Sequence, residues 1–428
     1  MSGRTPKRVH IAQIDKNSPA NAQVNKAGTG PLIGQGFFFN LYSSRVPIVK
    51  ATVAAALVFA WEQQAKLNAS VATNNDNFGR SVSIYGDTAI VGGYNQGGAS
   101  GSAYVFTRSG TTWTQKISTT EGGVNFFGWS VSIYGNTAIV GAYLDSSSKG
   151  KAYILTTDNN WTTTTSTELI APDGIAGDRF GYSVSIYGDT AIIGASKGDK
   201  DATANTGAAY IFTYDGINWT YQAKLNADDA TTNDAFGYSV SIYGDSAIVG
   251  AVSDDSSIGS AYVFTRSGTT WTQQEKLNAD DAADGDNFGH SVSIYGDSAI
   301  IGAWGDDDPN LSGAAYIFTR SGTTWTQQAK IKADDATDSV DKFGHSVSIY
   351  EDTAIIGAIN NNSAYVFTRS GTTWTQKKKL IADDVVGNVQ FGESVSIYGD
   401  TAIIGASKGD KDATENTGAA YVFNYTSQ

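Results

Sequence analysis

Short runs of alternating polar and apolar side chains recur along most of the chain. In the run Ser-Val-Ser-Ile-Tyr, valine and isoleucine share one face and the serines share the other, which is the period of a half-buried β-strand. Three further runs usually follow it, of the form Thr-Ala-Ile-Ile-Gly-Ala, Ala-Tyr-Val-Phe-Thr-Arg and Thr-Thr-Trp-Thr-Gln-Gln-Ala-Lys-Leu. Their β-branched and aromatic residues favour strands. The pattern predicts an all-β protein built from sets of four short strands.

The four-strand set is an internal repeat. The phrase Phe-Gly-x-Ser-Val-Ser-Ile-Tyr, in which x varies, begins at positions 78, 127, 180, 236, 288, 343 and 391. Seven copies at intervals of 48 to 56 residues, each holding four strands, are typical of the blades of a β-propeller. We therefore predict a seven-bladed β-propeller with four-stranded blades over residues 61–428.

The two ends of the repeat region complement each other. The seventh copy has no fourth strand after Tyr425, and residues 61–67 form a fourth strand with no copy before it. We expect strand 61–67 to complete the C-terminal blade and close the ring, because closure removes sheet edges that would pair with other chains. Six or eight blades fit this count less well.

The links between strands predict which rim of the propeller carries the variable loops. Gly-Asp pairs such as Gly86-Asp87 join the first two strands in a two-residue hairpin turn, where glycine accepts a positive φ. The sixth copy has Glu351-Asp352 instead, so we expect a strained or altered turn there. The short Arg-Ser-Gly-Thr-Thr link between the third and fourth strands lies on the same rim. The longer links share the opposite rim, which we call the loop face.

Composition and charge exclude several function classes. The chain has no cysteine, which excludes disulfides and thiol catalysis. Its net charge is −13, but residues 1–60 hold seven basic residues and one acid, so the remainder carries 22 basic and 41 acidic residues, or −19. Because an acidic surface repels phosphate backbones, we expect no nucleic-acid binding by the propeller.

The full repeat has a recognisable form. The segment Phe-Gly-x-Ser-Val-Ser-Ile-Tyr-Gly-Asp-Thr-Ala-Ile-Ile-Gly-Ala resembles FG-GAP repeats, the units of the integrin α-chain propeller and of many microbial and viral surface proteins. The resemblance covers residues 61–428 and implies a propeller used for cell-surface or matrix recognition, with no catalytic residues to transfer. Integrin-type repeats often carry a calcium loop between the first two strands. The two-residue Gly-Asp turn replaces it here, so that site is not carried over.

The position x changes while its neighbours repeat. If x begins the innermost strand, its seven side chains gather at the mouth of a central channel, where aromatic, cationic and anionic groups would share one small polar ligand. Drift at a tolerant surface position explains the same pattern. The candidate ligand-binding residues are Arg80, Trp129, Tyr182, Tyr238, His290, His345 and Glu393.

Carboxylates are dense in the predicted loop-face links. The best cluster is Asp280, Asp281, Asp284 and Asp286, and carboxylate oxygens are the ligands that Ca²⁺ prefers. Calcium is the one cofactor that the sequence suggests. The alternative interpretation is a set of solvated acidic loops that keep the protein soluble.

One tryptophan marks each fourth strand. A side chain repeated at one position is interpreted as packing between blades, and the alternative is a ring of sugar-stacking platforms. The seven residues are Trp61, Trp113, Trp161, Trp219, Trp271, Trp325 and Trp374.

The inventory for catalysis is small. The chain has three histidines, His10, His290 and His345, and it lacks Gly-x-Ser-x-Gly, Walker and His-Glu-x-x-His patterns. His290 and His345 belong to adjacent copies, but no third orienting group is identifiable. We predict that the protein is not an enzyme.

Residues 1–60 form a basic segment that precedes the repeats. Lys50 and the apolar run 51–60 have the charged flank, apolar core and Val-Phe-Ala cleavage site of a signal peptide, and cleavage there leaves Trp61 first. Sixty residues is about twice the usual signal length. An uncleaved membrane anchor, an organelle-targeting segment and an arm that docks an assembly partner are the alternatives.

These features predict a recognition or adhesion propeller that acts at the cell surface or outside the cell. It would bind a protein or glycan partner through its acidic loop face. Two alternatives stay open, a structural component of a virion or filament docked through residues 1–60, and a sugar-binding, lectin-type propeller.

Overall fold

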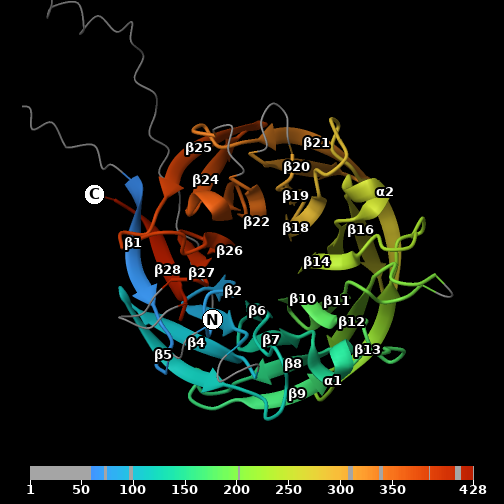
Figure 1. Ribbon diagram of the computed structural model, residues 1–428, viewed down its shortest axis with the longest axis horizontal. Helices are drawn as coiled ribbons and strands as arrows, with labels where there is room; N and C mark the ends of the chain where they lie inside the picture. Colours follow the sequence, from blue (N-terminus) through green and yellow to red (C-terminus); the bar gives the residue numbers. More distant parts are fainter. Residues whose placement is uncertain are drawn as a thin grey trace, which may run out of the picture. The chain divides into compact units, whose positions relative to one another are not determined.

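The computed structural model describes residues 59–71, 75–95, 100–200, 203–306, 312–336, 341–384, 386–409 and 416–427. The predicted N-terminal segment 1–60 lies outside these residues except for Phe59 and Ala60. Figure 1 shows the described strands as seven sheets in a ring, with the first strand of each repeat innermost. The predicted seven-bladed β-propeller is confirmed.

Each blade is a four-stranded antiparallel sheet, and in blades 1 to 6 the strands follow chain order from the centre outward. Blade 1 contains β2 (Ser81–Tyr85), β3 (Thr88–Gly93), β4 (Ser102–Ser109) and β5 (Thr112–Thr119). Blade 2 contains β6 (Ser130–Tyr134), β7 (Thr137–Ala142), β8 (Lys151–Thr156) and β9 (Thr165–Leu169). Blade 3 contains β10 (Phe180–Tyr187), β11 (Thr190–Ala195), β12 (Ala208–Tyr214) and β13 (Trp219–Leu225). Blade 4 contains β14 (Phe236–Tyr243), β15 (Ser246–Ala251), β16 (Ser260–Ser267) and β17 (Thr270–Leu277).

The remaining blades repeat this plan. Blade 5 contains β18 (Phe288–Tyr295), β19 (Ser298–Ala303), β20 (Ala314–Ser321) and β21 (Thr324–Ile331). Blade 6 contains β22 (Phe343–Tyr350), β23 (Thr353–Ala358), β24 (Ser363–Ser370) and β25 (Thr373–Leu380). Blade 7 contains β26 (Phe391–Tyr398), β27 (Thr401–Ala406), β28 (Ala419–Ser427) and β1 (Phe59–Leu67).

Helical turns occur only between second and third strands in the described part of the chain. They are α1 (Asp145–Ser148), α2 (Asp254–Ser257) and η2 (Ile359–Asn361). Ser146 and Ser147 have φ of 51° and 62°, so α1 is a left-handed turn rather than a regular α-helix, and α2 has the same form. None of these turns is long or apolar enough to cross a membrane.

The ring closes between the two ends of the repeat region, as predicted. β1 pairs antiparallel with β28, from Phe59 opposite Ser427 to Leu67 opposite Ala420. The closing strand is therefore two residues longer at its start than the predicted 61–67. In Figure 1 the blue β1 lies beside the red β28. Blade 7 is built from both ends of the described chain.

The hydrophobic core lies between blades rather than inside any one of them. One cluster joins Ile248, Val263 and Leu277 of blade 4 to Phe288 and Ile301 of blade 5, and each neighbouring pair of blades has a cluster of this kind. A blade thus buries both of its apolar faces only when two neighbours flank it. This arrangement explains why the second strands are apolar throughout.

The serines of Ser-Val-Ser-Ile-Tyr link neighbouring first strands. Ser81 Oγ donates to the carbonyl of Gly128 at 3.0 Å, and Ser83 Oγ accepts the N–H of Ile133 at 3.1 Å. Equivalent pairs of bonds join every blade to the next, and Ser394 donates to Gly79 to complete the circle. The polar side of the first strand is therefore a closed hydrogen-bonded ring.

A ring of seven tyrosines narrows the other end of the first strands, beside the Gly-Asp turns. Tyr85 lies 4.6 Å from Tyr134 and 4.8 Å from Tyr398 between ring centres, with the rings tilted by about 50° to each other. The other neighbouring pairs repeat this contact at 4.6 to 4.8 Å. We call this rim the turn face, and it lies opposite the loop face.

The turn of blade 6 shows the expected strain. Glu351 has a φ of 52°, which matches the 56° to 58° of the glycines at this turn in the other blades. A positive φ places the Cβ of an L-residue close to the backbone. The sixth blade therefore keeps the turn type and accepts the strain.

Candidate functional site

A tight turn at Phe-Gly sets the position of each variable side chain. In blade 4 the N–H of Tyr238 donates to the carbonyl of Ala235 at 3.1 Å, across Phe236 and Gly237. Phe236 is fully buried, and a Cβ added to Gly237 would lie 2.2 Å from the carbonyl oxygen of Ala208. Gly237 also has a φ of 83°, so only glycine fits this turn. The same hydrogen bond and glycine conformation recur in the other six blades.

The seven variable side chains converge on one cavity of about 250 Å³. The serine and valine that follow each of them line the cavity beneath. We call these seven residues the mouth ring. They are Arg80, Trp129, Tyr182, Tyr238, His290, His345 and Glu393. The structure brings all seven together on the loop-face side, and their role in ligand binding stays a prediction.

The charged members of the mouth ring are neighbours. Arg80 Nε lies 3.5 Å from Glu393 Oε1, and the Arg80 guanidinium lies 4.1 Å from the ring centre of Trp129. The Glu393 side chain is 11% exposed, and its Oε2 atom is buried with no hydrogen-bond partner among the described residues. Because a buried carboxylate oxygen without a partner is costly, this atom marks a place where a ligand donor would be stabilised.

The two histidines of the mouth ring lie side by side. Their ring centres are 4.8 Å apart, and His290 Nδ1 lies 3.0 Å from the backbone carbonyl of His345. Burial lowers the pKa of His290 to about 4, and the positive charge of Arg80 acts in the same direction. Burial likewise lowers the pKa of His345 well below its usual value. Both imidazoles are therefore neutral at pH 7.

Aromatic side chains occupy the other half of the mouth ring. Trp129, Tyr182 and Tyr238 contact one another in sequence, with ring centres 5.8 Å and 4.9 Å apart. Tyr238 then contacts His290 at 5.1 Å. The cavity is thus amphipathic, with an aromatic wall on blades 2 to 4 and a polar wall on blades 5, 6, 7 and 1.

A second set of variable residues lies beside the mouth ring, and it was not predicted from the sequence. We call it the outer ring, and it comprises Tyr94, Phe126, Tyr143, Arg179, Trp304 and Lys342. Tyr94 stacks on Phe126 at 5.2 Å, Tyr143 contacts Trp129 at 4.6 Å, and Lys342 lies 4.2 Å over Trp304. Each of these residues either precedes Phe-Gly or follows Gly-Ala or Gly-Gly in the repeat. Their variation at fixed positions of a constant repeat is the sequence feature that could have predicted this part of the site.

The residue before Phe-Gly has a positive φ in all seven blades. The values run from 54° to 64°, and none of the seven residues is glycine. Such strained backbone persists only where the surrounding structure enforces it, and it is common at functional sites. Here the strain turns Phe126, Arg179 and Lys342 towards the rim of the cavity, where they make the outer-ring contacts.

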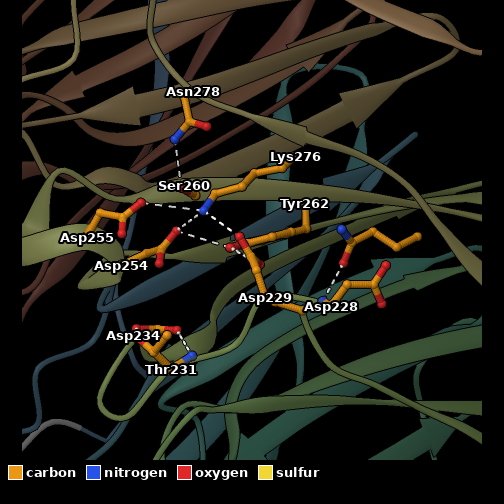
Figure 2. A network of polar contacts seen from close by, with 12 residues as sticks. Asp228, Asp229, Thr231, Asp234, Asp254, Asp255, Ser260, Tyr262, Lys276 and Asn278 are labelled. Atoms are coloured by element: carbon orange, nitrogen blue, oxygen red, sulfur yellow. Dashed lines mark hydrogen bonds and ion pairs between the residues drawn. The ribbon is translucent and has the colours of Figure 1, made fainter.

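Many loop-face carboxylates belong to clamps within a blade. In blade 4, Lys276 Nζ lies 2.8 Å from both Asp229 and Asp254, and Tyr262 donates its hydroxyl to both carboxylates (Figure 2). Burial opposes the charge of Lys276, but the two carboxylates outweigh it and raise the pKa of the ammonium group. Blades 3, 5, 6 and 7 repeat the clamp of lysine, tyrosine and inter-blade aspartate.

The four predicted calcium ligands make separate contacts. Asp281 accepts hydrogen bonds from Tyr316 at 2.9 Å and from Lys330 at 2.5 Å, so it is the clamp carboxylate of blade 5. Asp286 is buried and accepts the N–H of Ala283 at 2.8 Å, while Asp280 and Asp284 are exposed. In the described part of the chain, no three histidine or carboxylate groups converge in a metal-binding arrangement. Calcium binding at this cluster stays a prediction that the geometry does not support.

Most of the tryptophans join blades. Trp271 Nε1 donates to Gln222 of the preceding blade at 2.9 Å, and three other tryptophans make the equivalent bond. Each of these glutamines is the extra residue of a β-bulge, which turns its side chain towards the next blade. Trp161 differs from the prediction because it lies in a turn before β9 with a φ of 61°, and it is fully buried.

The fold and the site define a class: a seven-bladed β-propeller that carries one cavity lined by variable side chains at its loop face. The FG-GAP repeat family model matches the chain seven times, at residues 61–106, 114–155, 163–212, 219–264, 271–318, 325–369 and 374–423. The chain therefore belongs to the FG-GAP repeat family. A search of curated proteins found no match.

Proposed function

We propose that this propeller is a non-enzymatic recognition module that binds a protein or glycan partner through its loop face. The observation that carries the proposal is the contrast between a constant scaffold and a variable mouth. First-strand serines, buried phenylalanines and the tyrosine ring repeat from blade to blade, whereas the mouth ring holds arginine, tryptophan, tyrosine, histidine and glutamate. Variable side chains grouped on one face of a rigid frame are the usual arrangement of a recognition surface.

The clamps reduce the acidic charge that the loop face can offer to a partner. Asp229, Asp254 and Asp281 neutralise lysines of their own blades, so a share of the acidic loop charge is used within the protein. The mouth ring and outer ring instead offer aromatic surface together with polar groups, a composition typical of binding sites. We therefore place the contact surface around the cavity rather than along the acidic loops.

The setting of the module is part of the proposal. Membership of the FG-GAP family is compatible with binding or adhesion, and the apolar run 51–60 has the features of a secretion signal. Both support action at the cell surface or outside the cell. Mature N-terminal sequencing of the protein from its native source tests this location, and a chain beginning at Trp61 is the expected result.

A face-blocking experiment tests the proposed function. The chain has no cysteine, so a single introduced cysteine takes a polymer label at one site only. Ala283→Cys places the cysteine on an exposed link of the loop face. Thr269→Cys places it on the exposed turn between β16 and β17, on the turn face. Each variant would carry a maleimide polymer and be applied to a panel of immobilised glycans and extracellular-matrix proteins.

We expect the unlabelled propeller to bind members of the panel, and the label at residue 283 to abolish that binding. The label at residue 269 should leave binding unchanged, because it projects from the opposite face. Binding lost only with the label at residue 269 would contradict the proposal, as would the absence of binding to every member of the panel.

A further inference from the structure

We propose that the cavity of the mouth ring binds one neutral sugar ring, which is the terminal residue of a glycan. This inference rests on the proposed function, because it names the ligand class of the same loop-face surface. It is carried by three properties of the cavity: its balance of charge, its mixture of hydrogen-bonding groups and its size.

The paired charges of the mouth ring disfavour strongly charged ligands in the cavity. Arg80 and Glu393 are the charged members of the mouth ring, and they lie beside each other with opposite signs. An anion would contact the buried Oε2 atom of Glu393, and a cation would contact the Arg80 guanidinium. Either ligand would gain one attraction and meet one repulsion in a poorly solvated site, where both are strong. A neutral ligand avoids the repulsion.

The cavity offers hydrogen-bond donors and acceptors within one small space. Glu393 Oε2 is an acceptor with no partner among the described residues, and Arg80 pairs with Glu393 at 3.5 Å, longer than the 2.5 to 2.8 Å of the blade 4 and blade 5 clamps. The Tyr238 hydroxyl lies 3.4 Å from His290 Nε2. A sugar hydroxyl both donates and accepts, so adjacent hydroxyls of one ring fit a site with groups of both kinds.

The aromatic side chains and the size of the cavity also fit a single sugar ring. Trp129, Tyr182 and Tyr238 contact one another in sequence along one side of the cavity, and the C–H faces of a sugar ring pack against aromatic side chains. The cavity of about 250 Å³ is slightly smaller than the roughly 300–1,000 Å³ of most ligand sites, which suits a single ring rather than an extended chain. The outer ring would then contact the rest of the glycan.

Titration calorimetry with monosaccharides tests the inference. The purified propeller would be titrated with glucose, galactose, mannose, fucose and N-acetylglucosamine, and with glucuronate, glucosamine and free amino acids as charged probes. We expect saturable binding of at least one neutral sugar. Glu393→Gln keeps the size of the side chain but removes its charge, and it should weaken binding about tenfold or more.

Two controls separate site effects from folding effects. Tyr243→Phe removes a hydroxyl from the tyrosine ring at the opposite end of the first strands and should leave the sugar affinity unchanged. Thermal melting of the Glu393→Gln variant should match that of the parent protein. Binding of charged probes alone, no binding of any neutral sugar, or sugar binding that Glu393→Gln leaves unchanged would each overturn the inference.

The outcomes of the two experiments are distinguishable. If the loop-face label blocks binding of a matrix protein and no monosaccharide binds, the sugar inference fails and the proposed function stands. If a neutral sugar binds in the cavity but the loop-face label has no effect on panel binding, the cavity assignment stands and the proposed macromolecular function fails.

Discussion

Glu351 adopts a backbone conformation that the repeat otherwise reserves for glycine. The equivalent glycines have space around a would-be Cβ, with no heavy atom within 4 Å at Gly296 or Gly244. The conformational cost at Glu351 therefore comes from its own backbone, which has a φ of 52°, and not from clashes with neighbouring residues. For residues other than glycine the left-handed conformation costs roughly 1–2 kcal/mol.

Replacing Glu351 with glycine should stabilise the protein. We expect Glu351→Gly to raise the free energy of unfolding by about 1 kcal/mol, because the relieved strain exceeds the added freedom of the unfolded chain. Urea denaturation measures the difference. Gly296→Glu, the reverse change at the same turn of blade 5, should lower the free energy of unfolding by a similar amount. Equal stability of parent and Glu351→Gly would refute this account.

The sequence predicted the mouth ring but missed the outer ring for a physical reason. The Phe-Gly phrase fixes where the first strand begins, so its variable position could be placed at the channel mouth. Phe126 and Lys342 reach the rim only because their backbone has a positive φ. Such a conformation is not apparent for a phenylalanine or a lysine in a sequence, since these residues rarely adopt it.

At the scale of the element, the clamps differ between blades in how deeply the carboxylates that contact the lysine are buried. Lys276 contacts Asp254, whose side chain is 4% exposed, as well as Asp229. Lys379 of blade 6 contacts Asp335, whose side chain is 47% exposed. Removing the lysine leaves a buried carboxylate without a cation in the first case and a solvated one in the second. The two lysines should therefore contribute unequally to stability.

Lys276→Met and Lys379→Met form a matched pair that measures this difference. We expect Lys276→Met to lower the free energy of unfolding by about 2–3 kcal/mol, because Asp254 loses its cation in a buried site. Lys379→Met should cost less than about 1 kcal/mol. Chemical denaturation at pH 7 gives both values. Adding Asp254→Asn to Lys276→Met should recover part of the loss, and equal losses in the two single variants would contradict the argument.

Most strands could be predicted because the same four-strand pattern occurs in seven copies. The fourth strand of blade 2 is the exception, since β9 begins only at Thr165. Thr157 Oγ1 accepts the N–H of Trp161 and donates to the carbonyl of Thr163, which holds the preceding residues in a turn. Blade 2 lacks the Arg-Ser-Gly-Thr-Thr link at this place, and that difference was visible in the sequence.

At the scale of the whole propeller, closure depends on one strand pair. β1 supplies Trp61 and Leu67 to the hydrophobic clusters on either side of blade 7. Without β1, the outer edge of β28 would be exposed and free to pair with another chain. Closure of the ring could be predicted because the last copy lacks a fourth strand and an extra fourth strand precedes the first copy. The two added residues of β1 could not, because they are strand residues only through pairing with Thr426 and Ser427.

Truncation at two points tests the clasp. A chain that begins at Trp61 loses only the pairs Phe59–Ser427 and Ala60–Thr426, so we expect a folded monomer whose melting temperature is within a few degrees of the parent. A chain that begins at Asn68 loses all of β1 and should form oligomers or aggregates through β28. Light scattering coupled to size-exclusion chromatography distinguishes these states. A stable monomer from the shorter chain would show that the clasp is dispensable.

The antiparallel clasp also determines how the propeller would respond to mechanical load. Phe59 lies opposite Ser427, and Asn424 pairs with Thr401 just after a Gly-Asp turn, so both ends of the described chain leave blade 7 at the turn face. Tension between these ends would load first the terminal residue pair of β1 and β28, Phe59–Ser427, and then each following pair in turn. The two strands would therefore separate by unzipping rather than by shearing. The ring would open at blade 7 under low force, while the six other blades lie outside the path of the load.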